Sequence, residues 1–357
     1  MYFFCTYFDQ NYLPRGLALY RSLRLHCPAF KLWVLCMDDE SHRILLELDL
    51  PGVHAISLKA FERNDEMLRG AKENRSRIEY YFTCTPSLPL YVLDNWPDVN
   101  LITYLDADLF FFAGPDALFE EMGEGSIAIT AHRFTPTLRD RERYGIYNVG
   151  WLSFRRDENA LNCLRWWRER CIEWCFDREE DGRFADQKYL DDWPSRFDNV
   201  VVLQHKGANL APWNLDNHRL RAIGDHTVTV DGQRLIFFHF HALKKAGRWI
   251  YDPGWIEYGV NPSSVLRSDI YLPYLRTLFG LNRELLRSYS GHPVSNSFRA
   301  WKKEQSVLLS PLGRVAARLR ALTSLASEIA AGKMIFLPFS EGIREALDAL
   351  QRKPATP

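Results

Sequence analysis

Residues 101–108 read Leu-Ile-Thr-Tyr-Leu-Asp-Ala-Asp, an apolar run that ends in two carboxylates separated by one residue. Side chains of a strand alternate between its faces, so Asp106 and Asp108 can point the same way. Like charges held this close are costly unless a cation neutralises them, and ligands of open α/β sheets lie at the carboxyl ends of strands. The stretch therefore indicates a site for Mn²⁺ or Mg²⁺. A strand-end turn with two solvated aspartates is the alternative, because so short a motif is common.

The chain on either side of this stretch alternates apolar strands with amphipathic helices. We expect strands at 2–8, 31–37, 53–58, 126–131 and 147–154, and helices at 13–25, 40–48, 78–93 and 158–176. Apolar strands that alternate with helices form a sheet covered on both faces, which predicts an α/β fold with a Rossmann-like mixed, mostly parallel sheet flanked by helices. Asp231-Gly232 joins 227–230 to 234–240 in a predicted hairpin. Helices broken by Pro and Gly follow, so we predict an α/β domain at 1–255 and a C-terminal helical, partly basic region at 256–357.

Two further clusters of polar residues accompany the carboxylate pair. His239 ends the apolar run 235–238, where it either completes an Asp/Asp/His ion site or is a satisfied core histidine. Asp186 and Gln187 stand at the head of a helical segment, where Asp186 either caps the helix or contacts a ligand. In the run 209–214, Asn209 and Trp213 could face a sugar ring, and a core tryptophan explains the indole equally well.

The order of these motifs resembles the nucleotide-sugar-dependent glycosyltransferases of the glycogenin-like family, known as family 8, which have the A-type fold. The resemblance covers about residues 1–255. Ala242 departs from it, because the family's H-x-x-G-x-x-K signature has glycine there, and one or two residues are added between Thr6 and Tyr12. The matching motifs are Thr6-Tyr7 with Tyr12, the run 104–108 (family YLDAD), Asn148-Val149-Gly150, Asp186-Gln187, and His239 with Lys245 six residues later.

This resemblance implies a retaining transfer of a hexose from a nucleotide diphosphate sugar, UDP-sugars above all, to a glycan or lipid-linked acceptor. Breaking the anomeric bond leaves negative charge on the diphosphate, which an ion and a lysine would stabilise. The roles implied are ion binding by Asp106, Asp108 and His239, catalysis by Asp186 and Gln187, nucleotide binding by Thr6, Tyr7, Tyr12, Arg77, Ala107 and Lys245, and sugar or acceptor contacts by Asn148, Gly150, Asn209 and Trp213.

Two other kinds of protein compete with this interpretation. A haloacid-dehalogenase-type phosphatase also carries DxD after an apolar strand, but it usually has Thr or Val where this chain has Phe110, and its motif lies near the N-terminus. The intact Asp106, Asp108, His239 and Lys245 argue against a catalytically inactive module that binds nucleotides or carbohydrates. A purely structural scaffold would not need this ordered set of polar residues at strand ends.

Composition limits the partners and the location. The 357 residues are 46% hydrophobic, and 45 basic residues balance 45 acidic ones, which is typical of a globular protein and argues against a nucleic-acid partner. Cys163, Cys171 and Cys175 lie at helical spacing without a histidine at ligand spacing, which favours a helix core over a metal site. We find no targeting segment or spanning run and expect a cytoplasmic enzyme. The basic segment 283–333 is either a packed helical subdomain or a surface that rests on anionic lipid at the inner face of the membrane.

Overall fold

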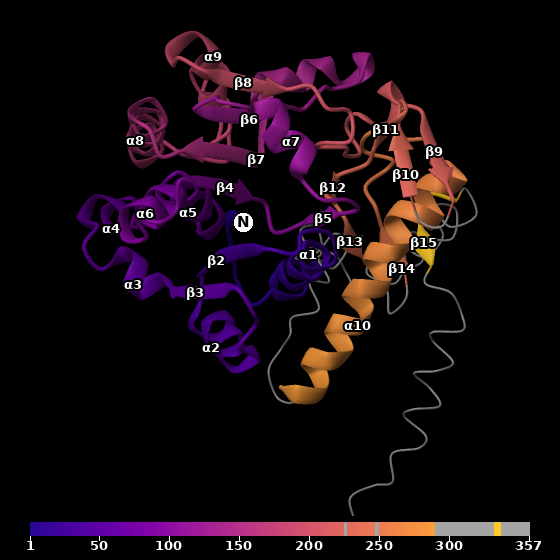
Figure 1. The fold of residues 1–357 in the computed structure, drawn as a ribbon, viewed down its shortest axis with the longest axis horizontal. Helices are drawn as coiled ribbons and strands as arrows, with labels where there is room; N and C mark the ends of the chain where they lie inside the picture. The colour runs from indigo at the N-terminus through magenta and orange to yellow at the C-terminus, as the bar shows by residue number, and fades with distance from the viewer. Residues whose placement is uncertain (225–226, 247–249, 290–331, 337–357) are drawn as a thin grey trace, which may run out of the picture. The chain divides into compact units, whose positions relative to one another are not determined.

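A seven-stranded mixed sheet forms the centre of residues 1–239 (Figure 1). The computed structural model describes residues 1–224, 227–246, 250–289 and 332–336. The β3-β2, β2-β1, β1-β4 and β6-β8 pairs are parallel, whereas β7 runs antiparallel to both β4 and β6. This arrangement confirms the predicted mixed, mostly parallel sheet. In spatial order the strands are β3 (Val53–Ser57), β2 (Phe30–Cys36), β1 (Tyr2–Phe8), β4 (Leu101–Leu105), β7 (Tyr147–Arg155), β6 (Ile127–Ala131) and β8 (Val200–Leu203).

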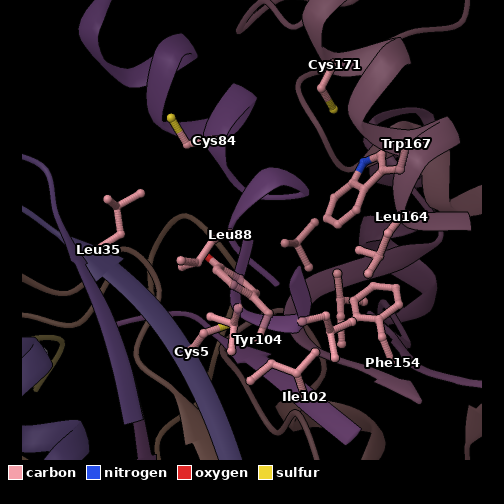
Figure 2. Close-up of a cluster of buried hydrophobic side chains, with 14 of the residues drawn as sticks. Cys5, Leu35, Cys84, Leu88, Ile102, Tyr104, Phe154, Leu164, Trp167 and Cys171 are labelled. Carbon is pink, nitrogen blue, oxygen red and sulfur yellow. The ribbon is translucent and has the colours of Figure 1, made fainter. Parts of the chain in front are cut away.

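One face of the sheet lies under α5 (Arg77–Cys84), α6 (Ser87–Asn95) and α8 (Glu158–Glu173). Figure 2 shows the core beneath them, in which Cys5 and Tyr104 of the strands meet Leu88 and Trp167 of the helices. The segment expected as one helix, 78–93, forms α5 and α6, because Pro86 has no N–H with which to continue the helical hydrogen bonds. Cys163 and Cys171 of α8 are buried in this core without a disulfide, which confirms the helix-core interpretation for them. Cys175 is buried in the same core but lies beyond the end of α8 at Glu173.

The opposite face carries α1 (Leu13–His26) and α7 (Asp116–Met122). An added Cβ on Gly16 of α1 would lie 2.1 Å from the Phe8 ring, so glycine allows the helix to approach β1 closely. The ring of Trp151 packs on this side between Phe119 of α7 and Phe237, with centroid distances of 5.6 and 5.5 Å. Both faces of the sheet are therefore covered, as apolar strands require.

The hairpin predicted over 227–240 is only partly present, because its second arm joins a separate two-stranded sheet. Residues Asp231 and Gly232, with φ of 52° and 88°, do turn β10 (Thr227–Val230) into β11 (Gln233–Arg234), and β9 (Leu220–Ile223) pairs with β10. The second arm does not continue along β10 to residue 240. Instead of one strand over 234–240, β12 (Phe237–His239) forms and pairs antiparallel with β5 (Leu109–Phe111). Those apolar residues gain a buried partner in β5 that local sequence cannot identify.

Short elements complete the first unit. They are α2 (Asp39–Leu48), α3 (Leu58–Glu62), α4 (Glu66–Lys72), α9 (Trp193–Arg196) and the 3-10 helices η1 (Pro136–Tyr144), η2 (Lys188–Asp192) and η3 (Leu215–Asn217).

The second unit begins at Phe240, and the domain boundary near residue 255 stays a prediction. In it, the ring of Phe240 stacks on Tyr274 at 3.8 Å between centroids, and Trp255 meets Tyr271 edge-on at 5.0 Å. Of the basic segment, Arg299, Lys302, Lys303, Arg314, Arg318, Arg320 and the apolar positions between 315 and 329 lie outside the described residues. None of the described helices has the length and apolar composition needed to cross a membrane. The described elements are β13 (Lys244–Lys245), β14 (Ile250–Asp252), the π-helix η4 (Leu266–Tyr271), α10 (Leu272–Ser288) and β15 (Ile335–Phe336).

Candidate functional site

Two strands bring the predicted ion ligands together. Asp106 and Asp108 follow β4, and the pairing of β12 with β5 places His239 opposite Leu109, the residue after Asp108. His239 Nε2 lies 3.1 Å from Asp108 Oδ1 and 3.6 Å from Asp106 Oδ2. One ligand atom from each of the three residues falls within 4.8 Å of the others. The structure thus joins two carboxylates and an imidazole in one group that could hold a divalent ion.

The charges in this group are poised for a cation. Burial raises the pKa of Asp106 to about 6, the carboxylate of Asp108 adds to the rise, and His239 and a 2.9 Å hydrogen bond from Tyr104 oppose it. For His239, burial disfavours the charged form, but Asp108 and Asp106 outweigh that effect and raise the pKa above its ordinary value. A divalent cation bound between these residues would neutralise the two neighbouring carboxylates.

Arg15 is a member of the site that the sequence analysis missed. Its guanidinium lies 3.6 Å from Asp108 Oδ2 and over the ring of Tyr12, 4.7 Å from the centroid. Its side chain is 15% exposed, so a guanidinium in addition to the His239 imidazole flanks the carboxylates, from the first turn of α1. The local sequence around Pro14 and Arg15 gives no signal for this contact, which depends on how α1 packs.

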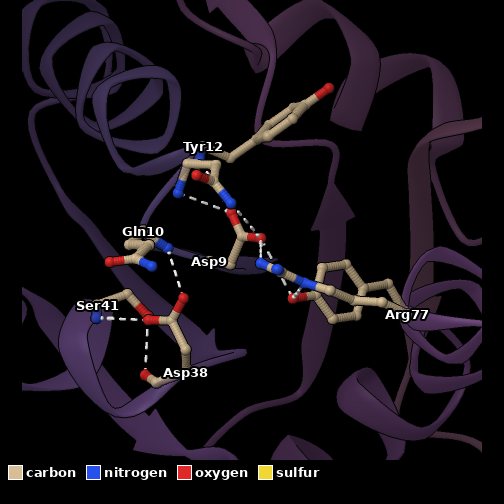
Figure 3. A network of polar contacts seen from close by, with 8 residues as sticks. Asp9, Gln10, Tyr12, Asp38, Ser41 and Arg77 are labelled. Carbon is tan, nitrogen blue, oxygen red and sulfur yellow. Dashed lines mark hydrogen bonds and ion pairs between the residues drawn. The ribbon is translucent and has the colours of Figure 1, made fainter. Parts of the chain in front are cut away.

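The loop between β1 and α1 is held by two carboxylates (Figure 3). Asp9, also missed from the sequence, accepts from the backbone N–H groups of Asn11 at 2.8 Å and Tyr12 at 3.1 Å, and pairs with Arg77. Asp38 accepts from the N–H of Gln10 at 2.9 Å while it caps α2. The structure therefore joins Tyr12 and Arg77, both predicted nucleotide contacts, through Asp9, and leaves the Tyr12 side chain 42% exposed.

Asp186 is buried beside the hydroxyl group of Thr85 and within reach of the charge of Asp106. It is 4% exposed, and burial raises its pKa to about 7, with the charge of Asp106 adding to the rise and a hydrogen bond with Thr85 opposing it. The hydroxyl of Tyr7 is 3.2 Å from Thr85 Oγ1. Ala185 holds a φ of 45° in the left-handed region, so the backbone bends sharply just before Asp186. Asp186 has no N-cap geometry, since the next helical turn begins at Lys188 with Gln187 at its cap position.

Relatives of known sequence establish the family. YfnF of Bacillus subtilis is 33% identical over 248 residues, which are 68% of this chain and 81% of YfnF. YfnD of the same organism is 31% identical over 278 residues, 77% of this chain and 88% of YfnD. The chain belongs to the YfnF and YfnD family. Both YfnF and YfnD are described as uncharacterized. No model of a known protein family matches the present chain.

Solved glycosyltransferase structures are similar to this member of the YfnF and YfnD family at low identity. The galactosyltransferase LgtC, crystallised with donor and acceptor sugar analogues, aligns with a TM-score of 0.44 at 15% identity over 75% of this chain and 100% of LgtC. GlyE of Streptococcus pneumoniae TIGR4 aligns with a TM-score of 0.42 at 16% identity over 80% of this chain and 64% of GlyE. At this distance no activity is carried over, and the functional argument depends on the site residues.

Several predicted contacts in this YfnF and YfnD relative lie inside the protein. Trp213 is 3% exposed and its ring meets His132 and His239 edge-on, while Asn209 is fully buried and donates to the carbonyl of Ala131. A sugar could reach neither side chain without a change in packing. Thr6 and Ala107 are also buried, at 0% and 7% exposed, and Lys245 belongs to the second unit on β13. The roles predicted for these residues stay predictions.

Proposed function

We propose that this protein is a metal-dependent glycosyltransferase that moves a hexose from a nucleotide diphosphate sugar, with UDP-sugars favoured, to a glycan or lipid-linked acceptor with retention of configuration. The observation that carries the proposal is the convergence of Asp106, Asp108 and His239 at the carboxyl end of β4. Ligands of open α/β sheets bind at this end of the strands.

The ligand atoms fit the ion that the proposal requires. Two carboxylate oxygens and one imidazole nitrogen suit Mn²⁺, and Mg²⁺ would use the carboxylates with more water. Their spread of 4.8 Å allows one ion to contact all three. When bound, such an ion stabilises the negative charge of the departing diphosphate.

The chain's own cations would act on the same diphosphate. Arg15 stands beside Asp108, so its guanidinium can donate to a phosphate oxygen held near the carboxylates. At an effective dielectric of about 20, a charge pair at ~4 Å is worth roughly 4 kcal/mol. If half of this energy is specific to the transition state, the rate rises about 30-fold. Lys245 enters on the resemblance alone, as a second partner of the leaving phosphate.

Asp186 is proposed to face the donor sugar. An ionised carboxylate stabilises an oxocarbenium-like carbon. Asp186 is close enough to Asp106 for the charge of Asp106 to raise the pKa of Asp186. Gln187 follows it, with its side-chain amide tied to the carbonyl of Tyr144 at 3.1 Å. The loop of Asp9, Tyr12 and Arg77 would hold the nucleotide, with the exposed Tyr12 ring as a stacking surface for the base.

The proposal is tested by the melting temperature of the full chain with a panel of nucleotide sugars, with and without Mn²⁺. A ligand at 100 times its Kd stabilises by about 2.7 kcal/mol, so the true donor should stand out only when Mn²⁺ is present. Asp108→Asn and His239→Ala should each remove that shift. Asp192→Asn, which alters a side chain 62% exposed and paired only loosely with Arg196, serves as the matched control and should keep it. The transferase proposal fails if no nucleotide sugar stabilises the protein with Mn²⁺ present.

A further inference from the structure

The side chain of Asn148 makes a hydrogen bond with each of four neighbours. Its Oδ1 accepts from the backbone N–H of Gly150 at 3.0 Å and lies 3.3 Å from His239 Nδ1. Its Nδ2 lies 3.2 Å from His132 Nε2 and donates to Gln187 Oε1 at 3.3 Å. A carboxamide offers two lone pairs and two N–H donors, so these four contacts use all of them. The residue is 5% exposed.

The neighbours fix which end of this amide is oxygen. Gly150 N–H can only donate, so the atom that it meets must be Oδ1. At the other end, Gln187 Nε2 donates to the carbonyl of Tyr144, which leaves Gln187 Oε1 to accept from Asn148 Nδ2. His132 agrees, because its Nδ1 faces the carbonyl of Ile146 at 3.3 Å and must carry a proton, so its Nε2 accepts.

This orientation determines the tautomer of His239. Since Asn148 Oδ1 can only accept, His239 must donate to it from Nδ1, and the lone pair of the neutral ring is then on Nε2. Nε2 is the nitrogen that faces Asp108 and Asp106. We propose that Asn148 is a positioning residue that holds His239 in the Nδ1–H tautomer, with Nε2 ready to bind the ion. This inference rests on the proposed function, and it replaces the sugar contact predicted for Asn148, whose donors and acceptors are already used.

Gly150 has a steric part in the same arrangement. An added Cβ would lie 2.6 Å from Asn148 Oδ1 and 2.9 Å from His239 Nδ1, so any side chain at 150 would separate the two residues or displace the imidazole. Trp213 closes the other side of the ring, edge-on at 5.2 Å between centroids. The Asn-x-Gly sequence on β7 therefore positions the ring of His239, which follows Asn148 by 91 residues in the sequence.

Manganese binding by Asn148 variants tests this role. Outer partners of a ligating histidine typically contribute 10- to 100-fold in metal affinity, so Asn148→Ala should weaken Mn²⁺ binding by about that factor, measured by electron paramagnetic resonance of the free ion. Asn148→Asp keeps the acceptor for Nδ1 and should restore most of the affinity. Asn214→Ala is the matched control: Asn214 is a buried amide with three hydrogen bonds of 2.8 to 3.0 Å, to Ala211, His132 and Asn209 backbone atoms, and should bind Mn²⁺ as the unsubstituted chain does.

A second measurement does not need a folded variant. Nitrogen-15 NMR of the unsubstituted, metal-free protein, at a pH where His239 is neutral, should show the proton on Nδ1. A proton on Nε2 overturns the inference, as does Mn²⁺ affinity of Asn148→Ala within twofold of the unsubstituted chain. Absence of Mn²⁺ binding by the unsubstituted chain is a different result, because it overturns the proposed ion site as well.

Discussion

Replacing Asp186 by Asn should raise the free energy of unfolding at both pH 8 and pH 5, and the gain should be much larger at pH 8. Asp186 is almost fully buried, and its pKa of about 7 stands far above the ordinary value of 3.8 because burial penalises the carboxylate. Between these two values the folded chain keeps a proton that the unfolded chain has lost. Raising the pH through this window therefore destabilises the folded state, and an amide at the same position escapes the penalty.

The size of the effect follows from the two pKa values. For a single group that titrates at about 7 when folded and 3.8 when unfolded, linkage gives a penalty of roughly 2 kcal/mol at pH 5 and roughly 4 kcal/mol at pH 8. The gain from Asp186→Asn should therefore grow by between 2 and 3 kcal/mol, approximately, over this interval. The hydrogen bond with Thr85 is available to an amide as well, so its loss does not offset the gain.

Urea unfolding of the full chain at pH 5 and pH 8, followed by tryptophan fluorescence in EDTA, measures the difference. Asp192→Asn is the control, and its exposed pairing with Arg196 should change stability by less than about 0.5 kcal/mol at either pH. A gain of equal size at both pH values, or a loss at pH 8, would refute the reasoning. The same Asp186→Asn variant should lose sugar transfer if the carboxylate stabilises the reacting carbon.

Three further predictions concern other parts of the chain. Arg15→Ala should weaken Mn²⁺-dependent binding of the donor by about 10- to 100-fold, the contribution of a hydrogen bond to a charged group, and Arg15→Lys by less, measured by calorimetry; equal affinity for Arg15→Ala would remove Arg15 from the site. Ala242→Gly should raise the free energy of unfolding by up to ~1 kcal/mol, because Ala242 holds a φ of 62° that glycine adopts without strain; a lower urea midpoint would contradict this. The basic segment 283–333 should make the protein co-sediment with anionic vesicles at low salt and dissociate from them near ~1 M salt. Equal binding to anionic and neutral vesicles, or binding to neither, would indicate that the segment only packs against the rest of the protein.

The sequence was sufficient to predict the sheet and its helices because these depend on local patterns. Apolar runs marked the strands, and the Asp-Gly turn of the β10-β11 hairpin was correctly placed because it needs only residues with positive φ. The prediction for the second arm of that hairpin was wrong from residue 237 onward. Strand partners are chosen by tertiary packing, and the apolar residues of β12 give the same pattern whether they pair with β10 or with β5.

The candidate site divides in a similar way. Asp106, Asp108 and His239 could be proposed from their positions at the ends of apolar runs, and the structure brings them together. Arg15 could not, since its contact with Asp108 depends on the packing of α1. For Trp213 the sequence left a sugar contact and a core position equally open, because an indole that stacks on a sugar and one that packs against a histidine have the same sequence signature.

The pairing of β5 with β12 also has a consequence for the order in which this protein folds. The two carboxylates leave the ribosome with the first half of the chain, whereas His239 arrives only at the end of its unit. Closing so long a loop costs entropy that neighbouring strand pairs such as β1 and β2 avoid, so β12 should dock after them. An ion held by all three ligands would add its binding energy to that docking alone, and hydrogen exchange at Phe237–His239 should slow with Mn²⁺ while exchange in β1 stays unchanged. An ion bound at the proposed site would then take part in the last step of the folding of this unit and not in its nucleus.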